Sequence, residues 1–296
     1  FWFFYLLYKA QSVIAYASGA SFNGWTLANR QEMGGYIALV VFVLWLARGH
    51  LWDVIRKTFS RESTIDDANE PLPYRWALLG LLAGTYLIGL MCSMAGMSFW
   101  LAIGVMVCFY IMAIVLTWMV TDGGFLFLLA IFRPSDYIMV AFGSSRFDAA
   151  SHTILTFEKT LMFDLREFMM PHVMNSFKAS DAINLRRRSL LGAMGIAMVI
   201  GLVVSYYSGL MAWYHKGGQN MGYWYDPEPW NRLTSFLNYP RGTNWLELSF
   251  IAIGAAITGG RIKIVDNRPV AALGLTAALV PFLEHNDANR QTFGVN

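Results

Sequence analysis

Formal charge is scarce in this chain. Charged residues make up only 14% of its 296 residues, and Arg75 is the one charged residue between Tyr74 and Val120. Soluble domains are about one-quarter charged, so this composition excludes an ordinary water-soluble fold. The rest is rich in apolar side chains, with 56% hydrophobic and 16% aromatic residues. We therefore predict an integral membrane protein of the all-α class.

Cysteine and the known catalytic motifs are also scarce or absent. The two cysteines, Cys92 and Cys108, fall inside predicted spans, where a thiol acts as a small hydrophobe. They exclude a disulfide framework, and the five histidines form no i, i+4 pair that would bind a metal. No HExxH, P-loop, GxSxG or haem-attachment CxxCH pattern occurs. The sequence thus predicts no enzyme activity, no cofactor and no metal site.

Long apolar runs dominate what is present. A helix needs about 20 apolar residues to cross about 30 Å of hydrocarbon, and residues 74–94 and 98–120 meet this length with apolar side chains on every face. Four further runs are interpreted as spans, which predicts six in total: 1–18, 34–47, 74–94, 98–120, 190–214 and 245–259. The shorter runs 123–132 and 269–283 predict re-entrant, interfacial or buried segments.

Lys and Arg are unevenly distributed between the predicted loops. With residues 48–75, 121–189 and the chain after 260 on one side, that side holds seventeen of the twenty-two basic residues. The positive-inside rule places this side in the cytoplasm and the aromatic loop 215–244 outside, as a lid on the membrane surface. The triplet Arg186, Arg187 and Arg188, directly before a span, predicts first a topology anchor and second an anionic-lipid site.

Lys9 and Gln11 are the candidate polar residues inside a span. A lysine at the centre of a membrane helix costs about 3 kcal/mol even on the lower scales. It therefore either faces a cavity or a partner along a translocation path, or extends its ammonium to the interface. The sequence leaves both interpretations open.

Small residues four positions apart predict helix-packing faces. Gly80 and Gly84 form a GxxxG motif, which permits the close approach of a neighbouring helix in lipid. Two similar faces are predicted in the fifth and sixth spans, and they are formed by Ala193, Ala197 and Gly201 and by Ala252, Ala256 and Gly260. These faces indicate a compact bundle over residues 1–260.

Several long segments resemble a bacterial family of polytopic membrane proteins of unknown function. They are QEMGGYIALVVFVLWLARGHL, EPLPYRWALLGLLAGTYLIGLMCSMAGMSFWLAIGVMVCFYIMAIVLT, DLREFMMPHVMNSFKASDAINLRRRSLLGAMGIAMVIGLVVSYYSGLMAWYHKGG and WNRLTSFLNYPRGTNW. The resemblance covers residues 1–260 and matches the later part of that family, which distantly resembles oligopeptide-type transporters. It implies that the sequence begins partway through a longer protein.

The chain after residue 260 departs from this pattern. Its segment ALVPFLEHNDANR, at 278–290, is similar to a motif in the β subunit of bacterial RNA polymerase, a soluble protein. This similarity does not imply polymerase activity, because there is no physical reason for an element of a soluble polymerase to follow a membrane bundle. The simplest account is a fused or misassembled C-terminus, so residues 261–296 are treated as a separate tail.

Two functional classes follow from the sequence. The first is a transporter, or half of one, in a bacterial cytoplasmic membrane, and it is favoured by the packed spans, Lys9 and the family resemblance. The second is a non-catalytic accessory subunit of a larger membrane complex, favoured by the lack of charged intramembrane pairs. The expected partners are the lipid bilayer and other membrane subunits or a missing N-terminal half, and no nucleic acid is expected.

Overall fold

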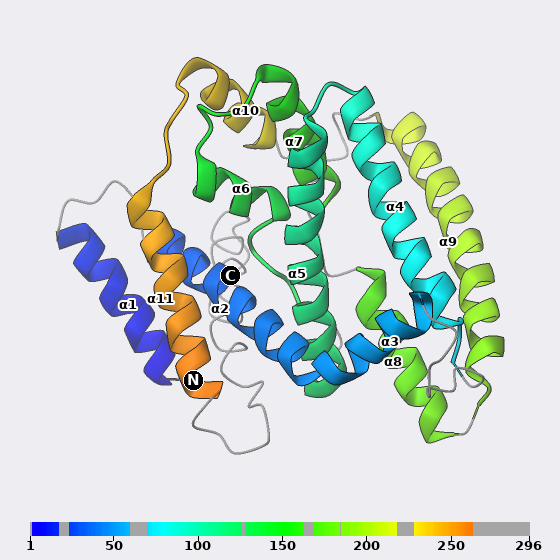
Figure 1. The fold of residues 1–296 in the computed structure, drawn as a ribbon. Helices are drawn as coiled ribbons and strands as arrows, with labels where there is room; N and C mark the ends of the chain where they lie inside the picture. Colours follow the sequence, from blue (N-terminus) through cyan, green and yellow to red (C-terminus); the bar gives the residue numbers. More distant parts are fainter. Residues whose placement is uncertain are drawn as a thin grey trace.

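All regular structure in the described residues is helical, as predicted. The computed structural model describes residues 2–17, 24–59, 70–125, 128–162, 168–183, 185–217 and 228–262. Its helices in chain order (Figure 1) are α1 (Trp2–Ala17), α2 (Gly24–Leu46), α3 (Arg48–Phe59), α4 (Tyr74–Met94), α5 (Phe99–Gly123), α6 (Pro134–Phe142), α7 (Ala149–Leu161), α8 (Met169–Ala182), α9 (Arg187–Lys216), α10 (Glu228–Asn238) and α11 (Trp245–Ile262). The run 269–283 and the polymerase-like segment 278–290 lie outside the described residues.

Among the described residues, three helices are long and apolar enough to cross a membrane, namely α4, α5 and α9. A fourth crossing is formed if α2 and α3, which are bent by 66° relative to each other, count as one broken span. The predicted six spans are therefore not confirmed. The prediction accepted shorter runs as full crossings, but the 16 residues of α1 cover only about 24 Å as a helix.

Helix α5 forms the centre of the structure (Figure 1). Its buried side chains pack against α2, against the segment that follows α5, and against α6. This main apolar core consists of Met33, Tyr36, Leu39, Val40, Met112, Val115, Leu116, Met119, Val120, Leu128, Ala130, Phe132, Tyr137 and Val140. Leu128, Ala130 and Phe132 are thus core residues, while the re-entrant or interfacial nature of the run 123–132 stays a prediction.

The chain returns along α5 after that helix ends. Gly124 follows the last residue of α5 and has a φ of +68°, a left-handed conformation that favours glycine. Ten residues later α6 begins, and its Ile138 side chain lies 3.5 Å from the Cβ position of Gly104, near the opposite end of α5. Gly104 and Gly124 are about 30 Å apart along a helix. We call the segment between α5 and α6, which is non-helical over residues 128–133, the non-helical return. The distance that it runs back along α5 is therefore close to the thickness of the hydrocarbon layer of a membrane.

Helices α2 and α11 pack with their backbones in contact. A Cβ at Gly34 would collide with the backbone oxygen of Ile251 and lie 2.7 Å from the amide nitrogen of Ala255. A Cβ at Gly254 would collide in the same way with the backbone of Gln31. Only glycine permits an approach this close, so these two glycines set the contact between α2 and α11.

The predicted packing face of α11 is rotated away from this contact. Ala252 and Ala256 are exposed in the described structure, whereas Gly254 is buried against α2. The i, i+4 spacing of small residues identified one face of α11 that could pack against a helix. The face of α11 that does contact α2 is the neighbouring one, which carries Gly254 and lies against Gly34. Contact of Ala252 and Ala256 with another chain stays a prediction.

The small-residue faces of α4 and α9 meet no other helix of the described chain. No described heavy atom outside the local helix backbone lies within 4 Å of a Cβ built at Gly80, Gly84 or Gly201. Ala193 and Ala197 are exposed as well. These five residues therefore do not hold the described bundle together, and a contact with a second chain stays a prediction.

The arginine triplet joins the start of α9 to two neighbouring segments. Arg187 forms ion pairs with Asp181 of α8 at 2.7 Å and with Glu70 at 3.1 Å. The Arg188 guanidinium donates to the backbone oxygen of Glu70 at 3.2 Å, and Arg186 is exposed directly before the helix. The triplet thus has protein partners, while its roles as a topology anchor and a lipid site stay predictions.

Helices α7 and α10 lie at the same end of the bundle (Figure 1). The rings of Phe157 and Trp230 are 5.1 Å apart, and the amide of Ser145 donates to the backbone oxygen of Arg241 at 3.0 Å. Residues 143–161, which the prediction placed on the opposite side from 215–244, therefore contact residues 228–241. The non-helical return explains this contact, because it carries the chain back across the bundle without an apolar helix, while the side of the membrane on which each segment lies stays a prediction.

Cysteine labelling tests this arrangement. In a background with Cys92 and Cys108 replaced by serine, we expect Arg146→Cys and Asp53→Cys to react with a membrane-impermeant maleimide from opposite sides. Both residues are exposed, and α3, which carries Asp53, lies at the opposite end of the bundle from α7, which begins just after Arg146 (Figure 1). Gly242→Cys is the control and should react from the side of position 146. Reaction of positions 146 and 53 from the same side would restore the topology predicted from the basic residues.

Candidate functional site

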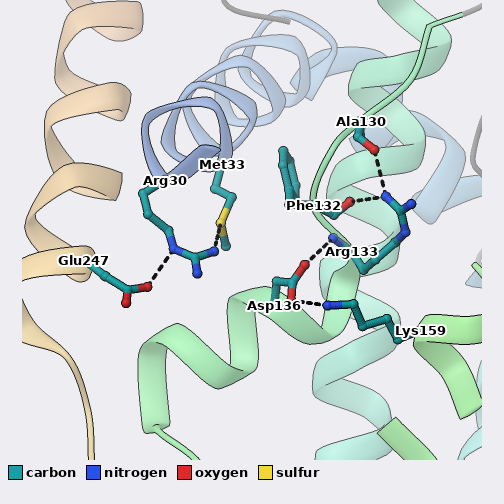
Figure 2. A network of polar contacts seen from close by, with 8 residues as sticks. All are labelled: Arg30, Met33, Ala130, Phe132, Arg133, Asp136, Lys159 and Glu247. Atoms are coloured by element: carbon teal, nitrogen blue, oxygen red, sulfur yellow. Dashed lines mark hydrogen bonds and ion pairs between the residues drawn. The ribbon is translucent and has the colours of Figure 1, made fainter. Parts of the chain in front are cut away.

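Five ionisable side chains form a connected group beside α5. They are Glu32 of α2, Arg133 and Asp136 at the start of α6, and Glu158 and Lys159 of α7. We call these five residues the polar centre. Figure 2 shows Arg133, Asp136 and Lys159 together with their neighbours. The polar centre lies where the non-helical return ends and where α2 crosses it.

Arg133 holds the end of the non-helical return. Its guanidinium donates to the backbone oxygens of Ala130 at 2.8 Å and Phe132 at 3.2 Å, and the residue is only 7% exposed (Figure 2). Carbonyl groups outside a helix need such donors in an apolar environment. The rings of Tyr36 and Tyr137 pack edge-on against Phe132 at 5.0 and 5.3 Å. The return is thereby fixed by both polar and aromatic contacts.

Asp136 is the anionic side chain at the start of α6. It accepts the backbone N–H of Arg133 at 2.8 Å and pairs with Lys159 at 3.3 Å. Burial by itself would raise the pKa of Asp136, but the nearby positive charges and this amide lower it below its usual value. The charges belong to Lys159 and, with smaller effects, to Arg30 and Arg232. Asp136 is therefore held as a carboxylate.

Glu32 is a buried carboxyl without a hydrogen-bond donor. The residue is 3% exposed, and neither of its carboxyl oxygens has a hydrogen-bond partner in the described part of the chain. The Tyr36 hydroxyl, one helical turn further along α2, is buried and unpartnered in the same sense. The charge of Arg133 acts on Glu32, although the Arg133 guanidinium donates to backbone oxygens.

Tyr137 connects the polar centre to the backbone of α2. Its hydroxyl donates to the backbone oxygen of Met33 at 2.9 Å. Burial raises the pKa of Tyr137 well above its ordinary value, and the neighbouring Tyr36, Cys108 and Glu32 add to this shift. Tyr137 therefore remains a neutral donor, and α6 is fixed to the residue that follows Glu32.

Glu158 is the second buried carboxyl that Arg133 influences. Burial raises the pKa of Glu158 to about 7, and the neighbouring Asp136 carboxylate acts in the same direction. The Ser135 hydroxyl, Arg133 and Lys159 act the other way. Glu158 can therefore exchange a proton near neutral pH.

The stability of the protein should reflect this titration. An unfolded glutamate has a pKa of about 4.3, so between about pH 4.3 and pH 7 the folded state keeps a proton that the unfolded state releases. Stability then falls as the pH rises through this window. We expect Glu158→Gln to make the decline smaller, measured as unfolding temperature in detergent across this range. The exposed Asp53→Asn is the control, and parallel curves for Glu158→Gln and the unmodified protein would contradict the expectation.

A second polar group lies at the edge of the polar centre, between α2 and α11. Arg30 pairs with Glu247 at 2.7 Å and also donates to the Met33 sulfur at 3.3 Å (Figure 2). Gln11 of α1 donates to the side chain of Gln31 at 3.3 Å. These contacts place polar groups from α1 and α11 beside the buried turn of α2 that carries Glu32.

A small cleft opens beside the polar centre, between α6, α7 and α10. Its volume of about 30 Å³ has room for about one water molecule. His152 lies on its wall and donates its Nε2 proton to the backbone oxygen of Ser144 at 2.8 Å. The other lining side chains are Ser135, Asp136, Met139, Leu155, Thr156, Lys159, Pro229, Arg232 and Phe236. The cleft thus connects the charged side chains of α6 and α7 to α10.

The structure separates the two polar residues predicted from the sequence. Gln11 reaches α2 through Gln31. The Lys9 ammonium lies over the rings of Tyr5 and Tyr8 of its own helix, at 5.3 and 5.2 Å from their centroids. Gln11 is therefore joined to the edge of the polar centre by a hydrogen bond. The functional role of either residue stays a prediction.

Sequence reasoning missed the polar centre because of where it began a helix. It started the second span at Gly34 and so left Glu32 in a loop, whereas α2 begins at Gly24. It also counted Arg133 and Lys159 as cytoplasmic basic residues. The sequence did contain a usable signal, which is the polar run directly before the apolar stretch of α2. If the helix is extended by one turn toward the N-terminus, it includes Glu32 and places this residue against the core.

A family comparison bears on the whole bundle. The family model described as a family of unknown function, DUF6785, matches residues 1–264. The chain belongs to this family. The matched region contains all the described helices and hence the polar centre. No curated protein and no solved structure matches the chain. Within the described residues no three His, Cys, Asp or Glu side chains are grouped to bind a metal ion.

Proposed function

We propose that this protein is a transporter of the bacterial cytoplasmic membrane, or half of one, and that the polar centre is its ion- or solute-binding region. The observation that supports this most directly is the burial of Glu32, Arg133 and the carboxyl oxygens of Glu158 beside non-helical backbone in an apolar bundle. Charged residues at membrane depth are costly and usually mark ion or substrate paths.

The backbone around the polar centre supports the same proposal. Transporters typically form their binding regions at interrupted helices, where backbone that is not helical is buried in protein. Here the non-helical residues 128–133 lead directly into the polar centre at Arg133. The 66° bend between α2 and α3 is a second interruption, at the far end of α2 from Glu32. The distant resemblance to oligopeptide-type transporters agrees with this assignment, and the arginine-rich end that carries Arg186, Arg187 and Arg188 would face the cytoplasm.

A second candidate function is that of an accessory subunit in a larger membrane complex. None of the most apolar stretch of α9 is buried in the described structure, and little of α4 is. These faces would be covered by lipid in a protein that acts alone and by another subunit in a complex. The two functions differ in whether the polar centre opens to both sides of the membrane.

Accessibility of a single cysteine distinguishes the two functions without knowledge of the substrate. Ser135 is buried and lines the cleft beside the polar centre, so Ser135→Cys is made in the background that lacks Cys92 and Cys108. For a transporter we expect reaction with an impermeant maleimide in both right-side-out and inside-out vesicles, because the site opens to each side in turn.

The matched control is Ser180→Cys, which is equally buried but lies in α8, away from the polar centre. It should react from one side at most. Reaction of Ser135→Cys from only one side, or from neither, would contradict transport and favour the accessory subunit.

A further inference from the structure

We propose that Glu32 binds and releases a proton, and that the proton is the ion coupled to transport by this protein. The inference rests on the proposed transport function, which it deepens by naming the ligand of the polar centre. It follows from the surroundings of the Glu32 carboxyl rather than from any sequence motif.

The first step is the absence of a donor at a buried carboxyl. Both oxygens of Glu32 lack a hydrogen-bond partner among the described residues, eight residues into a helix whose following turns are apolar. A buried carboxylate without hydrogen-bond donors loses its hydration, and no protein contact offsets the free energy of that loss. Binding of a proton to one oxygen removes the charge, forms a single O–H bond and requires no other reactant.

The second step concerns the groups that face Glu32. Arg133 and Tyr137 approach from the return and α6, and Tyr36 lies on the same helix. The other titratable groups in this region are the Arg30–Glu247 pair on the α11 side and Cys108 of α5, which acts on Tyr137. The charge that acts on Glu32 is the positive charge of Arg133.

This arrangement favours a proton over a metal cation. Hard cations such as Mg²⁺ and Ca²⁺ take six or more oxygen ligands and usually several carboxylates, whereas the described residues hold no group of three His, Cys, Asp or Glu side chains. The Arg133 charge also opposes a second fixed cation. A proton needs no ligand cage and converts the same carboxyl to a neutral group.

The third step is the consequence of proton release. Arg133 donates to the backbone oxygens of Ala130 and Phe132, so it holds the non-helical return in place. An ionised Glu32 would compete for these N–H groups, because hydrogen bonds between charged partners are roughly twice as strong as neutral ones. Transfer of the guanidinium to Glu32 would release the end of the return. Proton binding and the position of this segment are therefore coupled.

Infrared difference spectroscopy on the purified protein tests the inference, with the proton itself as the probe. We record acid-minus-alkaline spectra in potassium buffers and follow the C=O stretch of protonated carboxyls. We expect one buried-carboxyl band to be lost in Glu32→Gln and to shift in frequency in Glu32→Asp. In Glu158→Gln the Glu32 band should remain. If Glu32→Gln does not fold, the inference is tested by whether the band shifts in frequency in Glu32→Asp.

Two outcomes would overturn the inference. All carboxyl bands could persist unchanged in Glu32→Gln and Glu32→Asp, or the Glu32 midpoint could move with sodium concentration, which would indicate a metal-ion site. The result for Ser135→Cys separates these failures from failure of the proposed function. Two-sided access with an unaltered spectrum would leave transport standing and overturn Glu32, whereas a titrating Glu32 with one-sided access would overturn transport and coupling together.

Discussion

Gly34→Ala should destabilise the protein by about 1–3 kcal/mol or more, the range found for overpacked interiors. The added methyl group would collide with the backbone oxygen of Ile251 and come within 2.7 Å of the Ala255 amide nitrogen. Neither atom can turn aside as a flexible side chain could, so α2 and α11 would have to separate along their contact. The effect can be measured as a loss of unfolding free energy in detergent.

Gly80→Ala and Gly84→Ala are matched controls for this substitution. Both lie inside a long helix, and a Cβ at either position meets no described atom within 4 Å outside the local helix backbone. Alanine is favoured over glycine in a helix interior by about 0.5–1 kcal/mol, so these variants should keep or slightly raise stability. A large loss at position 84 would instead support a contact of the GxxxG face with a second chain.

Asp136→Ala should cost about 3–5 kcal/mol, as expected when one partner of a buried ion pair is removed. The Asp136 and Lys159 side chains are each 17% exposed, and the substitution leaves the ammonium without this carboxylate. It also removes the acceptor for the Arg133 amide at the start of α6. Removal of both charges in Asp136→Ala/Lys159→Met should recover part of the loss, and thermal unfolding measures both effects.

Asp181→Ala is the control on the surface. Asp181 also pairs with a cation, Arg187 at 2.7 Å, but its side chain is 48% exposed. Exposed pairs contribute about 0–1 kcal/mol, so this variant should lose little stability. Equal losses for Asp136→Ala and Asp181→Ala would show that burial does not control the strength of these pairs.

The helices that the sequence predicted well are those whose apolar character is complete. Predicted spans 74–94 and 98–120 correspond to α4 (Tyr74–Met94) and α5 (Phe99–Gly123) almost residue for residue. Here hydropathy alone determines the outcome, because length and the lack of charge admit no other structure in lipid. The ends of α2 were harder, because a polar first section is covered by α11 and the return, and these contacts come from residues far away in the sequence.

The polar centre could not be predicted from spacing for a related reason. Glu32 and Glu158 both lie within the influence of Arg133. This happens because the chain runs back along α5 before α6 begins, and no repeat or motif marks that segment. Each residue looked locally like part of a solvated loop. Only the arrangement of α2, the return and α7 shows that these charges share one buried region.

The contact between α2 and α11 has a consequence for biosynthesis. About 200 residues separate the end of α2 from the start of α11, and a ribosome adding 5–20 residues per second takes roughly 10–40 s to make them. During this interval the groove that Gly34 offers to Ile251 has no occupant from this chain, and the side of α2 beside Glu32 lacks its final cover. Helix α2 is therefore made and inserted without this contact, which forms only once α11 has been synthesised.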